Sequence, residues 1–230
     1  MTKRTALLAG ASGLVGGHCL QQLLADDRYE RVIVLVRRQL SASAFHPKLV
    51  QRVINFDLIP RLPDFPAADD VFCTLGTTIH KARTRDQFYK VDFTYVHELA
   101  KRSAECGAAQ FLLVSSVGAS ARSRVFYSKV KGEIEQALRS LRFEGLQVFR
   151  PSFLVGERTE ERFAERMGTM LFRALSPLMA GRFRRYRPVA AQTVARAMIQ
   201  IAHQELHGVN VFESDKIALI GAERQRGSRK

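Results

Sequence analysis

Short apolar runs alternate with longer segments of helical periodicity along the first two thirds of the chain. The apolar runs are those expected of strands buried on both faces of a sheet: Thr5–Ala9, Arg31–Val36, Val50–Phe56, Asp70–Leu75, 111–114 and 146–149. Between them, apolar residues recur at helical spacing over Leu14–Leu24, Gln87–Cys106 and Phe126–Leu141, and Gly107 supplies a helix stop. Strands that alternate with helices predict a doubly wound α/β fold, with a parallel sheet covered on both faces.

The alternation changes after Pro151. Residues 158–187 contain eight arginines and no lysine, with Phe163, Met167, Leu171, Ala174 and Leu178 at helical spacing. A helix over Ala190–His203 and a short strand over 209–212 then return to the sheet. We therefore expect a single domain over residues 1–230, in which 152–190 form a small region covering the substrate side and 222–230 form a basic tail.

Composition and charge narrow the class of protein. The chain has 230 residues, of which 46% are hydrophobic and 25% charged, so it can fold around a substantial core. The 36 Lys and Arg residues against 22 Asp and Glu give a net charge of +14, which favours anionic partners. Three distant cysteines, Cys19, Cys73 and Cys106, argue against disulfides or a thiolate zinc site and fit a reducing, cytoplasmic location.

The N-terminus resembles a signal peptide at first sight. Lys3 and Arg4 precede four apolar residues, but Gly10, Ser12 and Gly13 interrupt the run. We read this stretch as a first strand and its turn. No apolar run in the sequence approaches the length of about 20 residues that spans a bilayer.

A glycine-rich turn joins the first strand to the first helix. Gly10-Ala11-Ser12-Gly13-Leu14-Val15-Gly16 has the spacing GxxGxxG, a variant of the dinucleotide-binding fingerprint. Gly10 suits the tight turn, Gly13 lets the backbone approach a pyrophosphate, and Gly16 allows the helix to pack closely on the sheet. The free N–H groups and positive dipole of the helix N-terminus then favour phosphates. This strand-turn-helix unit predicts a Rossmann fold.

The second strand ends in two arginines. In an NAD-binding unit this strand normally ends in an acidic residue that binds the adenosine ribose. Here Arg37 and Arg38 occupy the position. Two guanidinium groups can bind a 2′-phosphate through charge-assisted hydrogen bonds, whereas a carboxylate would repel it. The pair favours NADP(H) over NAD(H), although a solvated basic loop would look the same in sequence.

Candidate catalytic residues follow a later strand. Ser115 and Ser116 come at the carboxyl end of the strand over 111–114, where open parallel sheets bind their ligands. Tyr127 and Lys131 are four residues apart on a predicted helix and share one face. A nearby ammonium lowers the pKa of a phenol, so such a tyrosine can exchange a proton near neutral pH. A serine hydroxyl can hold a substrate carbonyl during hydride transfer.

The chain resembles the short-chain dehydrogenase/reductase superfamily over most of its length. The residues that match the motifs of that superfamily, in the expected order, are Gly10, Gly13, Gly16, Ser116, Tyr127 and Lys131. Within that superfamily, the chain is most similar to the atypical branch that includes the Tat-interacting oxidoreductase-like proteins. The stretches that carry this similarity are Thr74-Leu75-Gly76-Thr77-Thr78 with Val91-Asp92, and residues 127–133.

The resemblance implies NADPH binding and further cofactor contacts. Asp57 and Leu58 would face the adenine, and Leu75, Gly76 and Thr77 would line the path to the nicotinamide ribose. Pro151, Ser152, Phe153 and Leu154 would close over the nicotinamide, while Lys131 would also hold the ribose. Ser116 matches the catalytic serine, and Ser115 would support the strand end. The chain departs from the pattern of this family in one loop near the site, Ile79-His80-Lys81-Ala82-Arg83, which is unusually basic.

These observations predict an NADPH-dependent oxidoreductase that acts on a small-molecule carbonyl or alcohol, as a monomer or homodimer. A second interpretation is an NADP(H)-binding redox sensor or regulatory protein with little turnover. A sugar-nucleotide epimerase is disfavoured because the region after Pro151 is short.

The sequence gives weaker indications of a metal site, of nucleic-acid binding and of membrane contact. His203 and His207 lack the arrangement of a zinc protease, and we expect no metal site. Charge alone, without a recognised motif, does not indicate specific nucleic-acid binding. The segment 158–187 could contact a membrane surface, cover the pocket or form a dimer contact, and the membrane is not favoured.

Overall fold

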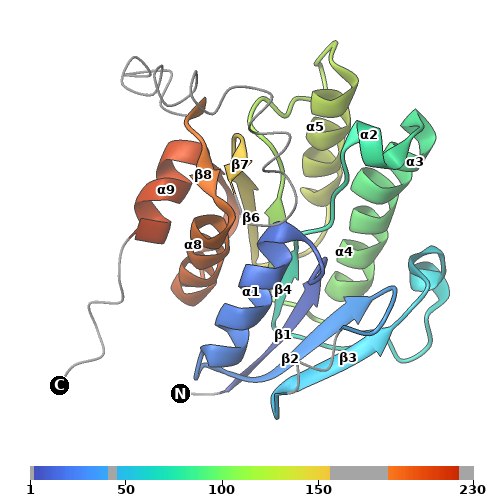
Figure 1. Ribbon diagram of the computed structural model, residues 1–230. Coiled ribbons are helices and arrows are strands. Elements are labelled where there is room, and N and C mark those ends of the chain that lie inside the picture. The colour runs from blue at the N-terminus through green and yellow to red at the C-terminus, as the bar shows by residue number, and fades with distance from the viewer. Residues whose placement is uncertain (1–2, 41–45, 156–185, 223–230) are drawn as a thin grey trace.

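The computed structural model describes residues 3–40, 46–155 and 186–222 (Figure 1). Seven parallel strands form one sheet in the order β3-β2-β1-β4-β5-β6-β9. Their bounds are β1 Arg4–Ala9, β2 Tyr29–Val36, β3 Leu49–Val53, β4 Asp70–Cys73, β5 Gln110–Val114, β6 Gly145–Arg150 and β9 Gly208–Glu213. The doubly wound α/β fold predicted from the sequence is therefore confirmed.

The strand order reverses direction between β1 and β4, and this reversal places the site. Successive strands run outward through β2 and β3 on one side, and through β5, β6 and β9 on the other. Ala9 pairs with both Leu35 and Cys73, so the loops after β1, β2 and β4 leave the sheet at one edge. Open α/β sheets bind ligands in the crevice at such a point.

Helices cover the two faces of the sheet (Figure 1). On one face lie α1 (Leu14–Ala25), α8 (Ala191–Gln204) and α9 (Ser214–Ala222); on the other lie α4 (Tyr95–Glu105) and α5 (Phe126–Leu138). The alternation of β1 side chains separates the two cores, because Ala6 and Leu8 pack with α1 and α8, while Leu7 packs with α4 and α5. Both faces of the sheet are thus buried, as its apolar strands require.

The helix predicted over Gln87–Cys106 is interrupted. It consists of α3 (Arg85–Tyr89), a π-helical turn over Lys90–Thr94, and α4. Single π-helical turns occur frequently at functional sites. This turn contains Asp92, which is fully buried.

Several element boundaries differ from the sequence prediction. The strand predicted to reach Phe56 ends at Val53, and a 3-10 helix, Phe56–Arg61, follows with Asn55 as its cap. The helix predicted to reach Leu141 ends at Leu138. Three elements were not predicted: α2 (Ile79–Ala82), α9, and the two-residue pair β7 (Leu154–Val155) with β8 (Val189–Ala190). The elements of two to four residues, α2, β7 and β8, carry too little periodicity to be recognised, and the nine-residue α9 buries only Ser214, Ile217 and Gly221.

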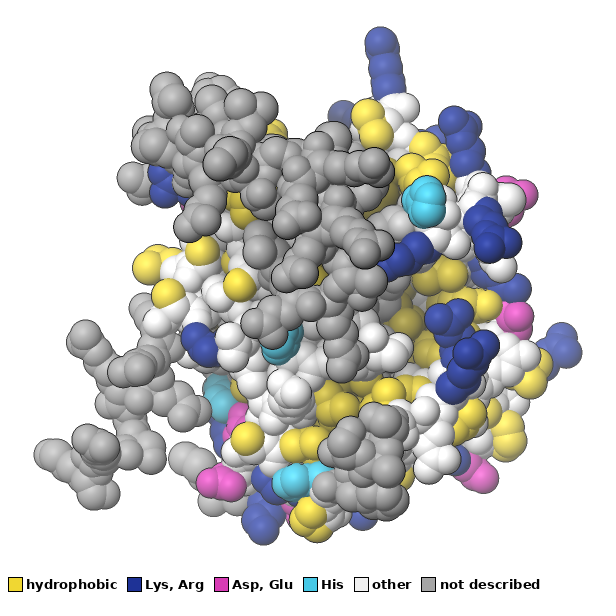
Figure 2. Space-filling view, viewed as in Figure 1, with side chains coloured by type: hydrophobic (Ala, Val, Ile, Leu, Met, Phe, Trp, Pro, Cys, Tyr) yellow, Lys and Arg dark blue, Asp and Glu magenta, His cyan; other side chains and the backbone are white. Residues whose placement is uncertain are grey.

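Most of the predicted substrate-covering region and basic tail lie outside the described residues, as do the apolar and arginine positions between 158 and 185. Within the described ranges, no helix is long and apolar enough to cross a membrane, and no three metal-ligating side chains come together. His203 instead contacts Asp26, with 2.6 Å between Nε2 and Oδ2. Basic side chains are more prominent than acidic ones on the face shown in Figure 2.

Candidate active site

The glycine turn has the geometry that close backbone approach requires. Gly10 has a φ of +94°, which side-chain-bearing residues rarely adopt, and a Cβ there would lie 2.5 Å from Thr74 Oγ1. A Cβ on Gly16 would lie 2.0 Å from the carbonyl oxygen of Gly10. Helix α1 can therefore begin directly against the turn only because both residues are glycine. Its N-cap, Gly13, makes no side-chain cap hydrogen bond, and its first turn holds no acidic residue. The N–H groups there suit an anion.

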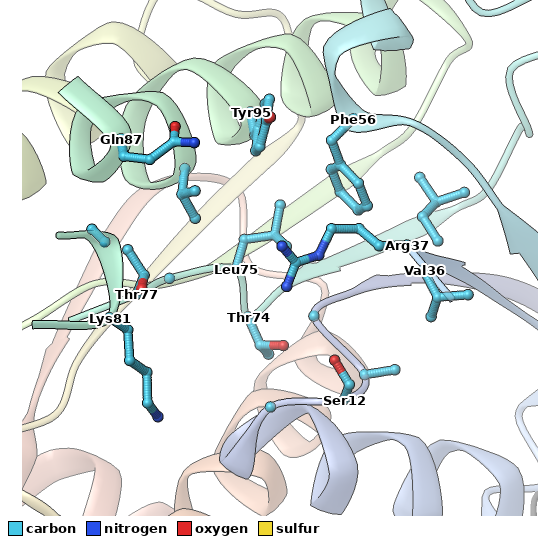
Figure 3. Close-up of a pocket in the computed structure, with 17 residues that line it drawn as sticks. Ser12, Val36, Arg37, Phe56, Thr74, Leu75, Thr77, Lys81, Gln87 and Tyr95 are labelled. Carbon is cyan, nitrogen blue, oxygen red and sulfur yellow. The ribbon is translucent and has the colours of Figure 1, made fainter. Parts of the chain in front are cut away.

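A pocket of about 410 Å³ runs from this turn along the edge of the sheet (Figure 3). It is lined by the predicted residues Gly10, Ser12, Gly13, Arg37, Leu75, Gly76 and Thr77. Its far wall comes from side chains that the sequence analysis did not single out for the site: Phe56, Gln87, Val91 and Tyr95. Leu14, Val15 and Gly16 lie beside it in the first turn of α1 and do not line it.

Arg37 extends from the end of β2 into the pocket beside Leu75 (Figure 3). Arg37 and Arg38 are both exposed, and together they line an adjoining hollow of about 440 Å³ with Ser12 and Leu40. Neither guanidinium forms an ion pair with a described residue. Two cations without an ion pair in the described part of the chain therefore lie next to the glycine turn, where they can bind an anion.

Asp57 and Leu58 lie outside the pocket lining. Asp57 accepts hydrogen bonds from Lys90 Nζ at 2.6 Å and the Tyr95 hydroxyl at 2.9 Å. These two hydrogen bonds lower the pKa of the Asp57 carboxyl, and the bond from Lys90 has the larger effect. Leu58 is 54% exposed. The side chain that reaches the pocket from this segment is the neighbouring Phe56, whose ring lies 5.6 Å from that of Tyr95.

Lys131 is held in a buried ion pair behind the pocket. Its Nζ lies 2.8 Å from Asp92 Oδ1, and Asp92 Oδ2 accepts a hydrogen bond from the Thr77 N–H at 2.9 Å. Burial lowers the pKa of Lys131, but the charge of Asp92 and its hydrogen bond outweigh burial and leave the pKa above its ordinary value. A Cβ on Gly76 would lie 3.6 Å from Lys131 Nζ, so the ammonium sits directly behind a residue that lines the pocket.

Asp92 is the functional candidate that the sequence analysis missed. The family resemblance includes Asp92 but assigns it no role. A signal was available, because Asp92 lies four residues before Val96 and continues the buried stripe of Val96, Leu99 and Ala100. A carboxylate on such a stripe requires a partner, and the partner is Lys131.

Tyr127 lies one helical turn before Lys131 on α5, as predicted. Its ring packs at 5.4 Å from Phe88, and the small apolar cluster beneath it includes Ala82 and Val130. Ala82 also lines the pocket, which places the tyrosine at that end of it. Tyr127 is close enough to Lys131 to interact with its charge. The two side chains therefore lie near one another on α5. Neither of them, nor Ser116, is among the residues that line the 410 Å³ pocket.

The two serines after β5 have different surroundings. The buried Ser115 donates a hydrogen bond to Glu135 Oε1 at 2.5 Å, and Arg150 Nε donates to the same carboxylate at 3.0 Å. Ser116 is half-buried, and its hydroxyl makes a longer contact of 3.4 Å to the Val117 carbonyl oxygen. Ser115 is thus tied into the structure, while the Ser116 hydroxyl is available to a ligand.

The segment after β6 lies next to these serines. The carbonyl oxygen of Pro151 accepts a hydrogen bond from the Val117 N–H at 2.9 Å. Pro151 is buried, Phe153 is 63% exposed, and Leu154 begins β7. None of the three lines the 410 Å³ pocket.

A family model, described as HIM1, matches residues 43–177 of the chain. The chain is also 34% identical to "Protein HTATIP2" of Rattus norvegicus over 201 residues, which cover 86% of this chain and 81% of that protein. The chain belongs to the HIM1 family. Membership confirms the resemblance to the Tat-interacting oxidoreductase-like branch of atypical short-chain dehydrogenases/reductases.

Fungal relatives of this HIM1-family protein correct one expectation. It is 38% identical to "Protein FMP52, mitochondrial" of Eremothecium gossypii over 154 residues, covering 66% of this chain and 67% of that protein. Other fungal relatives carry the same name. The cytoplasmic location expected from the cysteine content is contradicted by these mitochondrial relatives. Cysteine content reports a reducing compartment and does not distinguish one such compartment from another.

Among solved structures, the HIM1-family fold resembles Bordetella bronchiseptica WbmH, which was crystallised in complex with NAD+. The TM-score is 0.65 at 16% identity, covering 93% of this chain and 76% of that one. At this identity the likeness shows the Rossmann fold alone.

Proposed function

We propose that this protein is an NADP(H)-dependent oxidoreductase that transfers hydride to or from a small-molecule carbonyl or alcohol. The observation that carries the proposal is the placement of Tyr127 and Lys131 one helical turn apart on α5, where Tyr127 packs in one cluster with the pocket residue Ala82 and Lys131 lies behind the pocket residue Gly76. The sequence similarity to HTATIP2 and the fold shared with the NAD+-bound structure of WbmH support a nicotinamide dinucleotide as the cofactor.

The residues present fit such a cofactor. Gly10 and Gly16 leave a cradle that a Cβ would fill, and the first N–H groups of α1 point toward it, which suits a pyrophosphate. Arg37 and Arg38, without ion pairs to described residues, would bind a 2′-phosphate and favour NADP(H). When bound, the cofactor supplies or accepts the hydride.

Each catalytic candidate then has a distinct role. The Ser116 hydroxyl would hold the substrate oxygen, and Tyr127 would donate its proton to that oxygen as hydride reaches the carbonyl carbon. The products of this step are an alcohol and a tyrosinate, which regains its proton from solvent. Lys131, fixed by Asp92, would stabilise the tyrosinate electrostatically and keep the Gly76 side of the pocket in place.

One observation favours the alternative of a redox sensor with little turnover. The carboxylate of Asp92 compensates the charge of Lys131 at 2.8 Å. This compensation reduces the help that the ammonium gives to a negatively charged tyrosine. A sensor would bind reduced cofactor tightly and turn over no carbonyl compound.

The deciding experiment is Tyr127→Phe, with turnover of a carbonyl panel and NADPH affinity measured side by side. The phenylalanine keeps the ring packing on Phe88 and removes the proton. We expect turnover to fall by roughly 10²–10⁴-fold, the range for a positioned general acid, while NADPH affinity is retained.

Tyr89→Phe is the matched control, because Tyr89 lies on α3, is exposed and stacks on Phe93 away from the pocket lining. Full activity in folded Tyr127→Phe protein would refute the mechanism. Tight NADPH binding without any turnover in the unmodified protein would favour the sensor.

A further inference from the structure

Two basic segments converge at the end of the pocket where Tyr127 lies. The first, around α2 and α3, carries Lys81, Arg83 and Arg85, and Asp86 is the one acid between Gly76 and Lys90. The second is the loop before α5, which carries Arg122 and Arg124; no acid occurs from Ser115 to Lys131. We refer to Lys81, Arg83, Arg85, Arg122 and Arg124 as the basic rim.

Packing contacts bring the segments of the basic rim together. The Phe88 ring of α3 lies 5.7 Å from the Phe126 ring at the start of α5, and Arg85 stacks over Phe126 at 5.2 Å. The loop before α5 folds back along that helix, where the Ser120 N–H donates to the Ser128 carbonyl oxygen at 2.9 Å. Lys81 itself lines the pocket (Figure 3). Lys81 therefore belongs to the pocket wall, and the other four rim residues lie on the segments packed beside that end of the pocket without lining it.

The charges of the basic rim are not neutralised by the described part of the protein. All five side chains are exposed, and none has an ion pair among residues 3–40, 46–155 and 186–222. Nearby cations differ in this respect, because Lys90 pairs with Asp57 and Lys129 with Glu133. Figure 2 shows basic and apolar side chains intermixed on this side of the molecule, over α2, α3 and the start of α5. Like charges gathered without counter-charges repel one another and attract an anion.

The backbone of the rim is also unusual. Arg83, directly after α2, has a φ of +66° and a ψ of −36°, a conformation that residues other than glycine rarely adopt. Such positions are found preferentially at functional sites. The cofactor does not account for this cluster, because its expected anionic groups bind at the glycine turn and beside Arg37, at the other end of the pocket.

We infer that the substrate carries a negatively charged group, a carboxylate or a phosphate, which binds the basic rim while its carbonyl or alcohol lies at Tyr127. Ile79 and Val125 are exposed apolar residues on the same two segments, so an apolar body attached to the anion would also be accommodated. The inference rests on the proposed function, since it names the substrate class of that site.

The test measures binding, so that it does not depend on turnover. The probes are 4-(hydroxymethyl)benzoate, 4-(hydroxymethyl)phenyl phosphate and the neutral 4-(hydroxymethyl)benzamide, titrated calorimetrically at millimolar concentration with and without NADPH. We expect a charged probe to bind about tenfold more tightly than the amide, with a preference that decreases as salt is added. The two charged probes distinguish a carboxylate from a phosphate.

The variants are Arg122→Glu with Arg124→Glu, and the matched control Arg139→Glu with Arg142→Glu. Arg139 and Arg142 are exposed and lie just beyond the other end of α5, so they undergo the same charge change away from the pocket. The first pair should remove the roughly tenfold preference for charge, and the control should keep it.

Equal affinity for the acids and the amide, no measurable binding of either acid, or a preference unchanged by the rim variant would overturn the inference. Salt-resistant sedimentation with anionic vesicles that the rim variant abolishes would assign the rim to a membrane surface instead. Failure to bind NADPH would contradict the proposed function, and the titrations without NADPH would still report on the rim.

Discussion

Asp92→Asn isolates the charge of the buried ion pair from its shape. Asparagine keeps an oxygen that can accept from the Thr77 N–H, but it removes the negative charge 2.8 Å from Lys131 Nζ. Asp92 is fully buried, and the Lys131 side chain is 5% exposed. The variant therefore leaves a buried ammonium without its counter-charge.

The size of the effect follows from the distance and the burial. At 2.8 Å the attraction is about 6 kcal/mol with an effective dielectric constant of about 20, and part of it offsets the desolvation of both charges. Removing one partner of a buried pair costs about 3–5 kcal/mol in measured cases. Taking about 3 kcal/mol, a domain of this size should lose about 6–12 °C in melting temperature.

The pH dependence of stability should change sign. In the unmodified protein the pKa of Lys131 lies above its ordinary value of 10.5, so its contribution is fully present below pH 10.5 and is lost as pH rises through the folded-state pKa. In Asp92→Asn, burial, the largest influence on Lys131, is no longer offset by the charge of Asp92 and depresses that pKa. The free energy of unfolding of the variant should then increase between about pH 8 and 10, where the lysine can lose its proton.

Urea denaturation across this pH range is the assay. Asp27→Asn is the matched control, because the Asp27 side chain is fully exposed and should affect stability little. The double variant Asp92→Asn with Lys131→Met should recover much of the lost stability, since no unpaired charge remains buried. An unchanged melting temperature in Asp92→Asn, or a double variant less stable than the single, would refute this account of the ion pair.

Three further predictions concern the cofactor and the serines. NADPH should bind at least about tenfold more tightly than NADH, a difference of about 1.4 kcal/mol, and Arg37→Ala with Arg38→Ala should abolish the preference in calorimetry. Gly16→Ala should abolish cofactor binding and lower the melting temperature, because its Cβ would meet the Gly10 carbonyl at 2.0 Å; Gly17→Ala, whose nearest contact is 3.7 Å, should change neither. Ser116→Ala should lower turnover while cofactor affinity is retained. Ser115→Ala should instead lower the free energy of unfolding by about 1–3 kcal/mol in denaturation experiments, because the buried Glu135 loses a hydrogen-bond donor.

Periodicity was sufficient to predict the sheet and the long helices. Strands β1, β2 and β5 are apolar along nearly their whole length because both faces are covered, and α5 and α8 have one apolar stripe each. The π-helical turn was not predictable in this way, because it occurs inside a continuous helical pattern. The exits of β3 and α5 were misplaced by three residues each, since their last apolar residues pack from a 3-10 helix and a turn.

The candidate site was predictable where a single segment forms it. The glycine turn, Arg37 and the residues after β4 line the pocket as expected, because each is fixed by the strand it follows. Asp57 is placed near the pocket by the family resemblance and by no local pattern. The resemblance implies that it faces the adenine, and this stays a prediction; in the structure Asp57 pairs with Lys90, and the neighbouring Phe56 lines the pocket. The Asp92–Lys131 pair joins two elements distant in sequence, so no local pattern contains it.

The net charge of +14 does not show which cations can bind an anion, because some of them are already paired with carboxylates in the fold. Lys131, Arg150 and Arg4 are cations in the sequence count, yet each faces a carboxylate within 3 Å and attracts little from solution. Arg37 and Arg38 at one end of the pocket, and the basic rim at the other, have no such partner in the described part of the chain. The proposed NADP(H), with its 2′-phosphate, would account for the first group. The proposed anionic substrate would account for the second group, because its charged group would bind the basic rim while its reacting carbon lies at Tyr127.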